Sequence, residues 1–123
     1  MIALDTIAII LIGHWVFDFY CQTDEQAKEK STSNVWLSKH VLTYTLGLAL
    51  MALMLFPMFP CVWGAAAWIS LNAIAHFFTD YITSRASSLL WKEGNTHDFF
   101  VVIGADQLIH YLTLFGTLVY YTR

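Results

Sequence analysis

Charged side chains are scarce in this sequence of 123 residues. Lysine and arginine number six and aspartate and glutamate nine, so charged residues make up 12% of the chain and hydrophobic ones 58%. This charged share is about half that of an average soluble protein. The basic residues are scattered and the net charge is −3, which argues against the basic stripe of a nucleic-acid-binding protein. We therefore expect a membrane protein without a nucleic-acid partner.

Cysteine and proline are equally sparse, with two residues of each. Cys21 and Cys61 fall near opposite ends of successive apolar segments, too far apart across a bilayer for a disulfide. The first apolar segment has no basic residue before it and no A-x-A cleavage site, which favours a retained helix over a signal peptide. The chain also has no G-x-S-x-G elbow, P-loop or dinucleotide-binding fingerprint. Its chemistry must therefore come from other residues.

Four apolar segments, each near the roughly 20 residues that cross a hydrocarbon core, dominate the sequence. We predict helices over about residues 2–21, 35–59, 61–83 and 99–121. The third helix can extend to a stop at Gly94, and Asn95 or Thr96 can cap the fourth. The expected fold is an all-α, transmembrane four-helix bundle that forms a single domain over residues 1–123.

Two polar connections, residues 23–34 and 84–98, lie on one side of the membrane if the four helices alternate in direction. Five of the six basic residues belong to that side, namely Lys28, Lys30, Lys39, Arg85 and Lys92. Only Arg123 belongs to the other side. The positive-inside rule then places the polar connections in the cytoplasm and both termini on the outer side.

Two short motifs occur twice each. The motif His-x3-Asp begins at His14 and at His76, in the first and third predicted helices, and His-x-Leu-Thr begins at His40 and at His110, in the second and fourth. Such a repeat indicates two similar helical hairpins, related by an axis along the membrane normal. Matches this short also arise by chance, which leaves four unrelated helices as the alternative.

Seven ionisable side chains fall within the predicted membrane spans: His14, Asp18, His40, His76, Asp80, Asp106 and His110. Each would cost about 2.5–3.5 kcal/mol if it faced lipid, and together they would cost roughly 15–25 kcal/mol. This exceeds the whole stability of a small domain. We therefore expect all seven side chains to face the interior of the bundle and to satisfy one another.

The spacing of these residues agrees with that expectation, because residues four apart share one face of a helix. This spacing joins His14, Asp18 and Gln22; His40 and Tyr44; Asn72, His76 and Asp80; and Asp106 and His110. At 1.5 Å per residue, the ionisable groups fall in the half of the bundle nearest the polar connections. The sequence thus predicts one polar centre near the cytoplasmic leaflet.

Four imidazoles and three carboxylates from four helices suit a divalent metal ion. Neutral histidine and carboxylate ligands favour zinc, iron or manganese, and we expect zinc first. All seven residues are candidate ligands.

Candidate catalytic groups, acting as general base or proton shuttle, are Asp18, Asp80, Asp106 and His40. Residues expected to support the ligands are Gln22, Tyr44, Asn72 and Gln107. Seven ligands suffice for two ions; alternatively, the carboxylates orient the histidines around one ion.

The ordered motifs also resemble a known family. They are His14-x3-Asp18-Phe19-x2-Gln22, Lys39-His40 with Tyr44, His76-x3-Asp80-Tyr81 and Asp106-Gln107-x2-His110. Together they resemble domain of unknown function 3307, a family of small membrane proteins of bacteria and their phages. The resemblance covers essentially the whole chain. It implies a multi-pass protein of the bacterial inner membrane and implies no activity. In that membrane, the orientation given by the positive-inside rule makes both termini periplasmic.

Three functions are compatible with these features. The first is a metal-dependent hydrolase of a lipid or lipid-linked substrate that enters from the cytoplasmic leaflet, with Lys39, Arg85 and Lys92 attracting an anionic head group. The second is a small proton- or ion-coupled transporter or channel, which would also need polar groups in the nearly bare outer half. The third is a non-catalytic phage or host membrane factor that binds another membrane protein. The sequence leaves the oligomeric state open.

Overall fold

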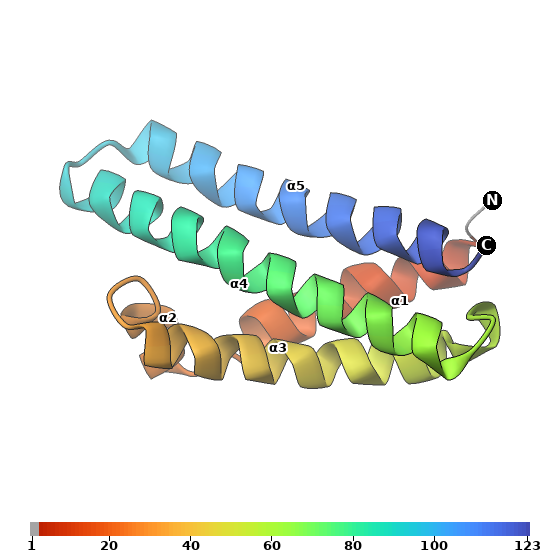
Figure 1. Cartoon of the computed structure of the whole chain (residues 1–123). Helices are drawn as coiled ribbons and strands as arrows, with labels where there is room; N and C mark the ends of the chain where they lie inside the picture. The colour runs from red at the N-terminus through yellow and green to blue at the C-terminus, as the bar shows by residue number, and fades with distance from the viewer. Residues whose placement is uncertain (1–2) are drawn as a thin grey trace.

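A computed structural model describes residues 3–123, and every regular element within them is helical (Figure 1). The elements are α1 (Leu4–Trp15), the π-helix η1 (Val16–Tyr20) that continues it, α2 (Asp24–Glu29), α3 (Asn34–Met54), the 3₁₀ turn η2 (Phe56–Met58), α4 (Val62–Lys92) and α5 (Thr96–Tyr121). No strand occurs in this part of the chain. The predicted all-α class is confirmed.

The long helices lie side by side along one axis (Figure 1). Helix α4 packs against α3 and α5, and α1 packs against α3. One end of the bundle holds α2 and the turn between α4 and α5, and the other end holds both termini and the turn between α3 and α4 (Figure 1). The helices therefore alternate in direction, and both polar connections lie at the same end.

The helix bounds differ from the prediction at the end of α3, whereas α4 extends to the stop at Gly94 that the sequence allows. Helix α3 ends at Met54 instead of residue 59, because Pro57 lies in the 3₁₀ turn that follows. Helix α4 runs to Lys92 and stops at Gly94, whose φ of 71° favours glycine. The polar connection expected over residues 84–98 is therefore mostly helix. The expected first residue of the first helix, Ile2, lies outside the described residues.

Helix α2 was not predicted, because residues 23–34 were expected to form a connection. The side chain of Thr23 accepts a hydrogen bond from the backbone N–H of Gln26, and Gln26 Oε1 accepts one from the backbone N–H of Thr23. This capping box begins the helix. The buried Gln26 also donates from Nε2 to Thr43 Oγ1 on α3, at 3.4 Å. The described residues thus form five α-helices instead of four.

The apolar core lies toward the end of the bundle that holds the termini. Its fully buried members include Ile10, Leu48, Trp68, Leu114 and Leu118. Within residues 3–123, two helices, Asn34–Met54 and Thr96–Tyr121, are long and apolar enough to cross a membrane. Helix α1 is only 12 residues long before the π-helix begins.

Gly47 lies where η1 packs closely against α3. A methyl group at this position would overlap the ring and Cβ of Phe17, and atoms so near the backbone cannot easily move. We expect Gly47→Ala to lower the free energy of unfolding by about 1–3 kcal/mol. Gly104, whose added Cβ would meet nothing within 4 Å, is the control, and Gly104→Ala should gain up to about 1 kcal/mol. Unfolding in mixed micelles, followed by circular dichroism, measures both; equal stabilities would contradict the prediction.

Candidate metal centre

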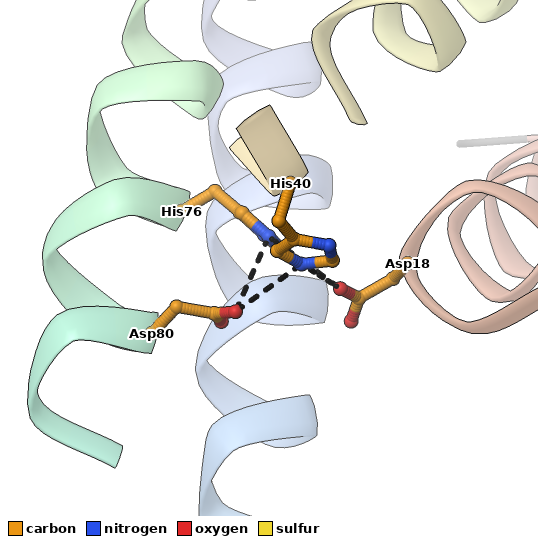
Figure 2. Close-up of side chains that lie close together, drawn as sticks. All are labelled: Asp18, His40, His76 and Asp80. Atoms are coloured by element: carbon orange, nitrogen blue, oxygen red, sulfur yellow. Dashed lines mark hydrogen bonds and ion pairs between the residues drawn. The ribbon is translucent and has the colours of Figure 1, made fainter. Parts of the chain in front are cut away.

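Four side chains from three elements converge at the middle of the bundle (Figure 2). Asp18 comes from η1, His40 from α3, and His76 and Asp80 from successive turns of α4 (Figure 2). All four are at most 3% exposed. We call these residues the four-residue set.

The ligating atoms of the four-residue set surround one point. His40 Nε2 lies 3.0 Å from Asp18 Oδ1 and 3.3 Å from Asp80 Oδ2. His76 Nε2 lies 3.4 Å and 3.7 Å from the same two oxygens. The two Nε2 atoms are 3.1 Å apart. Two nitrogens and two oxygens therefore face one another from three elements.

These separations fit a tetrahedral metal site. Bonds of 2.0–2.2 Å from zinc to nitrogen and oxygen place tetrahedral ligand atoms about 3.3–3.6 Å apart. The five separations between 3.0 and 3.7 Å bracket this range. The four-residue set can hold a divalent ion.

Hydrogen bonding alone satisfies this set poorly. A neutral imidazole has one N–H. If both rings carry it on Nε2, the two N–H groups face each other, so Nε2 of one ring can donate to Nε2 of the other only if that second atom is an acceptor without a hydrogen. The lone pair of that acceptor then faces carboxylate oxygens, which is repulsive. The Nδ1 atoms of both His40 and His76 are also buried without a hydrogen-bond partner. A cation at the centre of the set removes the repulsion between Nε2 and the carboxylates.

The π-helix sets the position of Asp18. The backbone N–H of Cys21 donates to the carbonyl of Val16 at 2.8 Å, an i→i+5 bond that widens this turn of the helix. Asp18 lies within the widened turn and is 3% exposed. π-Helical turns inside α-helices are frequent at functional sites. The irregularity thus coincides with a candidate ligand.

The three remaining predicted ligands, His14, Asp106 and His110, lie beside the four-residue set. His14 Nε2 is 3.5 Å from Asp18 Oδ2. His110 Nε2 is 3.5 Å from Asp80 Oδ1, and its Nδ1 is 3.4 Å from Asp106 Oδ2. All seven ionisable residues singled out from the sequence therefore meet in one cluster.

Two of the four expected supporting residues contact this cluster. Tyr44 stacks on the His76 ring, with centroids 3.9 Å apart, and its hydroxyl lies 2.8 Å from His14 Nδ1. Gln107 Oε1 is 2.8 Å from His14 Nε2. Gln107 Nε2 donates to Asp18 Oδ2 at 3.3 Å and to Asp106 Oδ2 at 2.9 Å.

The structure does not bring the other two expected supporting residues to the ligands. Asn72 Nδ2 donates to the carbonyl of Trp68 and to Thr117 Oγ1, both at 2.8 Å. Gln22 Oε1 is buried without a hydrogen-bond partner, and its side chain lines a neighbouring cavity. Asn72 shares the helix face of His76 but joins α4 to α5 nearer the apolar core.

Sequence reasoning missed Lys30 and Thr83. Lys30 Nζ donates to Asp80 Oδ2 at 2.8 Å, and Thr83 Oγ1 donates to Asp106 Oδ1. Lys30 follows directly after α2, and nothing in the local sequence distinguishes it from Lys28. Only the docking of α2 onto α3 brings its ammonium group to the cluster.

The cluster opens onto a cavity of about 570 Å³ between η1, α2 and the adjoining ends of α4 and α5. Asp80 and Asp106 line it. Its polar lining includes Lys28, Lys30, Ser84, Ser87 and Ser88, and its apolar lining includes Phe19, Trp91, Phe99, Phe100 and Ile103. The cavity therefore joins cationic and hydroxyl groups to a large aromatic surface.

The basic residues expected at the mouth of the site lie elsewhere. Lys39 lies over the Trp36 ring, 3.9 Å from its centroid. Arg85 lies over the Tyr81 ring and donates to Asn34 Oδ1. Neither residue lines the cavity, and neither does Lys92. The positive charge at the cavity comes from Lys28 and Lys30 instead.

Comparison with known proteins gives a match over residues 6–122 to a family described as "Protein of unknown function (DUF3307)". Neither the curated proteins nor the solved structures contain a match to this chain.

Proposed function

This chain belongs to the DUF3307 family over nearly its whole length, and because that family's description names no activity, we propose a function from the geometry of the site. The protein is a metal-dependent membrane hydrolase that cleaves phosphate esters of lipids. The observation that carries this proposal is the four-residue set, whose two nitrogens and two oxygens face one another. The set lies beside a cavity that is lined by both cationic and aromatic side chains.

The distribution of side chains supports a multi-pass arrangement in which α1 with η1, α3, α4 and α5 each cross the bilayer. Large apolar side chains cover the outer surface of three of these helices; for example, Leu42 on α3, Phe78 on α4 and Leu112 on α5 are each more than 60% exposed. Five of the six basic residues are Lys28, Lys30, Lys39, Arg85 and Lys92, and these belong to the half of the bundle that holds α2 (Figure 1). The positive-inside rule places that end in the cytoplasm and both termini in the periplasm.

The charge balance of the cluster supports a bound cation. Asp18, Asp80 and Asp106 carry three negative charges when ionised, and Lys30 supplies one positive charge at Asp80. With neutral histidines, two negative charges remain at a largely buried site, and uncompensated buried charge is costly. One divalent ion cancels them. Histidine and carboxylate ligands in tetrahedral arrangement favour zinc.

The cavity supports a substrate that has an anionic head and apolar chains. An ion held by the four-residue set would polarise a phosphoryl oxygen and activate water for attack. Lys30 and the serines of α4 can contact the phosphate, while Phe19, Trp91 and Phe100 can contact the chains. This pairing of lysine and aromatic side chains matches a phospholipid at the membrane interface.

Asp106 is placed to carry the proton in this reaction. Water attacks phosphorus, the bond from phosphorus to the lipid oxygen breaks, and the proton of the water must reach that lipid oxygen. Asp106 lies outside the four-residue set, lines the cavity and is held by Thr83. Its carboxylate can accept the proton and return it to the leaving oxygen.

The apolar core favours hydrolysis over transport. A pathway across the membrane needs polar groups through both halves, whereas Ile10, Leu48, Trp68, Leu114 and Leu118 fill the half nearest the termini. The four-residue set borders the cavity through Asp80, whereas the core toward the termini is apolar.

Replacing Lys30 tests the substrate assignment. We expect metal-loaded protein to release phosphate from phosphatidic acid in mixed micelles, and chelator-treated protein to release none. Lys30→Ala should lower kcat/KM about 10- to 100-fold, because a hydrogen bond to a charged group contributes about 1.5–3 kcal/mol.

Lys92→Ala is the control, since Lys92 belongs to the same end of the bundle but does not line the cavity. Equal losses in the two variants would refute the role of Lys30. Absence of phosphate release by the metal-loaded wild type would refute the proposed activity on this lipid class.

A further inference from the structure

Asp18 uses only one of its two oxygens in the four-residue set. Its Oδ1 faces His40 and His76, while its Oδ2 lies 3.5 Å from His14 Nε2. His14, Asp18 and His110 each offer an atom within 4.8 Å of the other two, and all three residues are buried. This arrangement is a second group of candidate ligands that shares one carboxylate with the first.

We propose that the cluster binds a second divalent ion, held by His14, Asp18 and His110. The inference rests on the proposed metal-dependent function and specifies the number of ions. Asp18 bridges the two positions, and ions that act together in hydrolytic two-metal sites lie about 3.5–4 Å apart. Three protein ligands leave positions open for water or substrate, as in catalytic sites.

His110 is the strongest evidence for the second position. Its side chain is only 4% exposed, and both of its ring nitrogens are buried without a hydrogen-bond partner. The nearest carboxylate oxygens, on Asp80 and Asp106, are 3.5 Å and 3.4 Å away and make no hydrogen bond with it. Unsatisfied buried polar atoms are costly, and an ion at this position would use one of these nitrogens.

Gln107 occupies the space between the proposed ligands. Its amide nitrogen donates to Asp18 Oδ2 at 3.3 Å, and its Oε1 lies 2.8 Å from His14 Nε2. The amide thus satisfies the same oxygen and nitrogen that the second ion requires. Binding of the ion turns the Gln107 amide away from Asp18 and His14.

The second ion would also balance the negative charge of the phosphate substrate. With one divalent ion, the three carboxylates and Lys30 sum to zero. A second ion leaves the cluster, which borders the cavity through Asp80 and Asp106, with two positive charges, and these match the charge of a phosphate monoester dianion. The second ion therefore gives the phosphate a counter-charge that Lys30, already paired with Asp80, cannot supply alone.

Metal stoichiometry tests this inference. The full chain, purified in mild detergent and freed of metal with a chelator, is titrated with Co²⁺ and followed by visible absorption and elemental analysis. We expect two ions per wild-type chain and one ion per His110→Asn chain, with the tetrahedral Co²⁺ spectrum of the four-residue set retained. His97→Asn is the matched control, because His97 is an exposed histidine on the same helix, and it should keep two ions.

The outcomes separate the two proposals. One ion per wild-type chain overturns the second position and leaves the first centre in place, whereas no bound ion overturns both. Asp106→Asn should keep two ions, and a loss of one ion there would overturn the ligand assignment in favour of Asp80, Asp106 and His110. If His110→Asn fails to give a helical, monodisperse protein, the counts for the wild type and Asp106→Asn still decide.

Discussion

His76→Ala protein should purify without a metal ion in the four-residue set and should hydrolyse no lipid phosphate. His76 is fully buried, and its Nε2 lies within 3.7 Å of ligating atoms of Asp18, His40 and Asp80. Removing His76 leaves an ion in this set with three of its four protein ligands. Changes in residues that merely orient ligands lower metal affinity or activity about 10- to 100-fold. Loss of a ligand itself should therefore lower the metal affinity more than 100-fold.

Elemental analysis, phosphate release and circular dichroism measure the three parts of this prediction. His97→Ala serves as the control, since it removes an exposed histidine. Tyr44→Phe is a second control, because it keeps the ring that stacks on His76 and removes only the hydroxyl near His14; it should retain the ion of the four-residue set. Wild-type metal content in His76→Ala would contradict the ligand assignment.

The convergence of the ionisable residues could be predicted because its energetic cause is large. Placing His40 or Asp80 against lipid costs more than any local helix preference contributes, so the apolar sequence around each residue determines which way its helix must face. The separation of four positions along the sequence then identifies partners on the same helix, such as His76 with Asp80. Both arguments depend only on composition and periodicity.

The positions of Lys30 and Asp18 could not be predicted in the same way. Lys30 reaches Asp80 only because α2 forms and docks through Gln26 onto Thr43, which is a tertiary contact between segments of ordinary polar sequence. The π-helix around Asp18 depends on one widened turn, a small energy difference that no residue pattern marks. Asn72 illustrates the opposite case, because periodicity places it on the face of His76 while its amide donates to Trp68 on α4 and to Thr117 on α5.

Helix ends were predictable only where a residue type forces them. Gly94 stops α4 because its positive φ is accessible to glycine, and the Asn95 side chain caps α5 by accepting from the backbone N–H of Asp98. Helix α3 ends sooner than expected, because the chain enters the 3₁₀ turn that contains Pro57. The end of the apolar run in the sequence is therefore not the end of the helix.

Removing the metal should lower the stability of the wild-type protein, and Asp18→Asn should destabilise the protein only while metal is bound. A ligand present at 100 to 1,000 times its Kd, and bound only by the folded state, stabilises the protein by about 2.7–4.1 kcal/mol. Chelation should therefore cost the wild type about this much. Without metal, Asp18 is a buried carboxylate among other carboxylates, so the neutral amide of Asp18→Asn should make the metal-free protein equally stable or more stable.

This change of sign is the diagnostic, because a purely structural hydrogen-bond network predicts that Asp18→Asn destabilises the protein whether or not metal is present. Unfolding in mixed micelles, with zinc and with chelator, measures the free energy for both proteins. Asp98→Asn, at an exposed aspartate in the first turn of α5, should lower the stability by no more than about 1 kcal/mol and should leave its dependence on zinc unchanged. If chelation leaves the stability of the wild type unchanged, the cluster is neutralised by its own protons, and the metal centre is refuted.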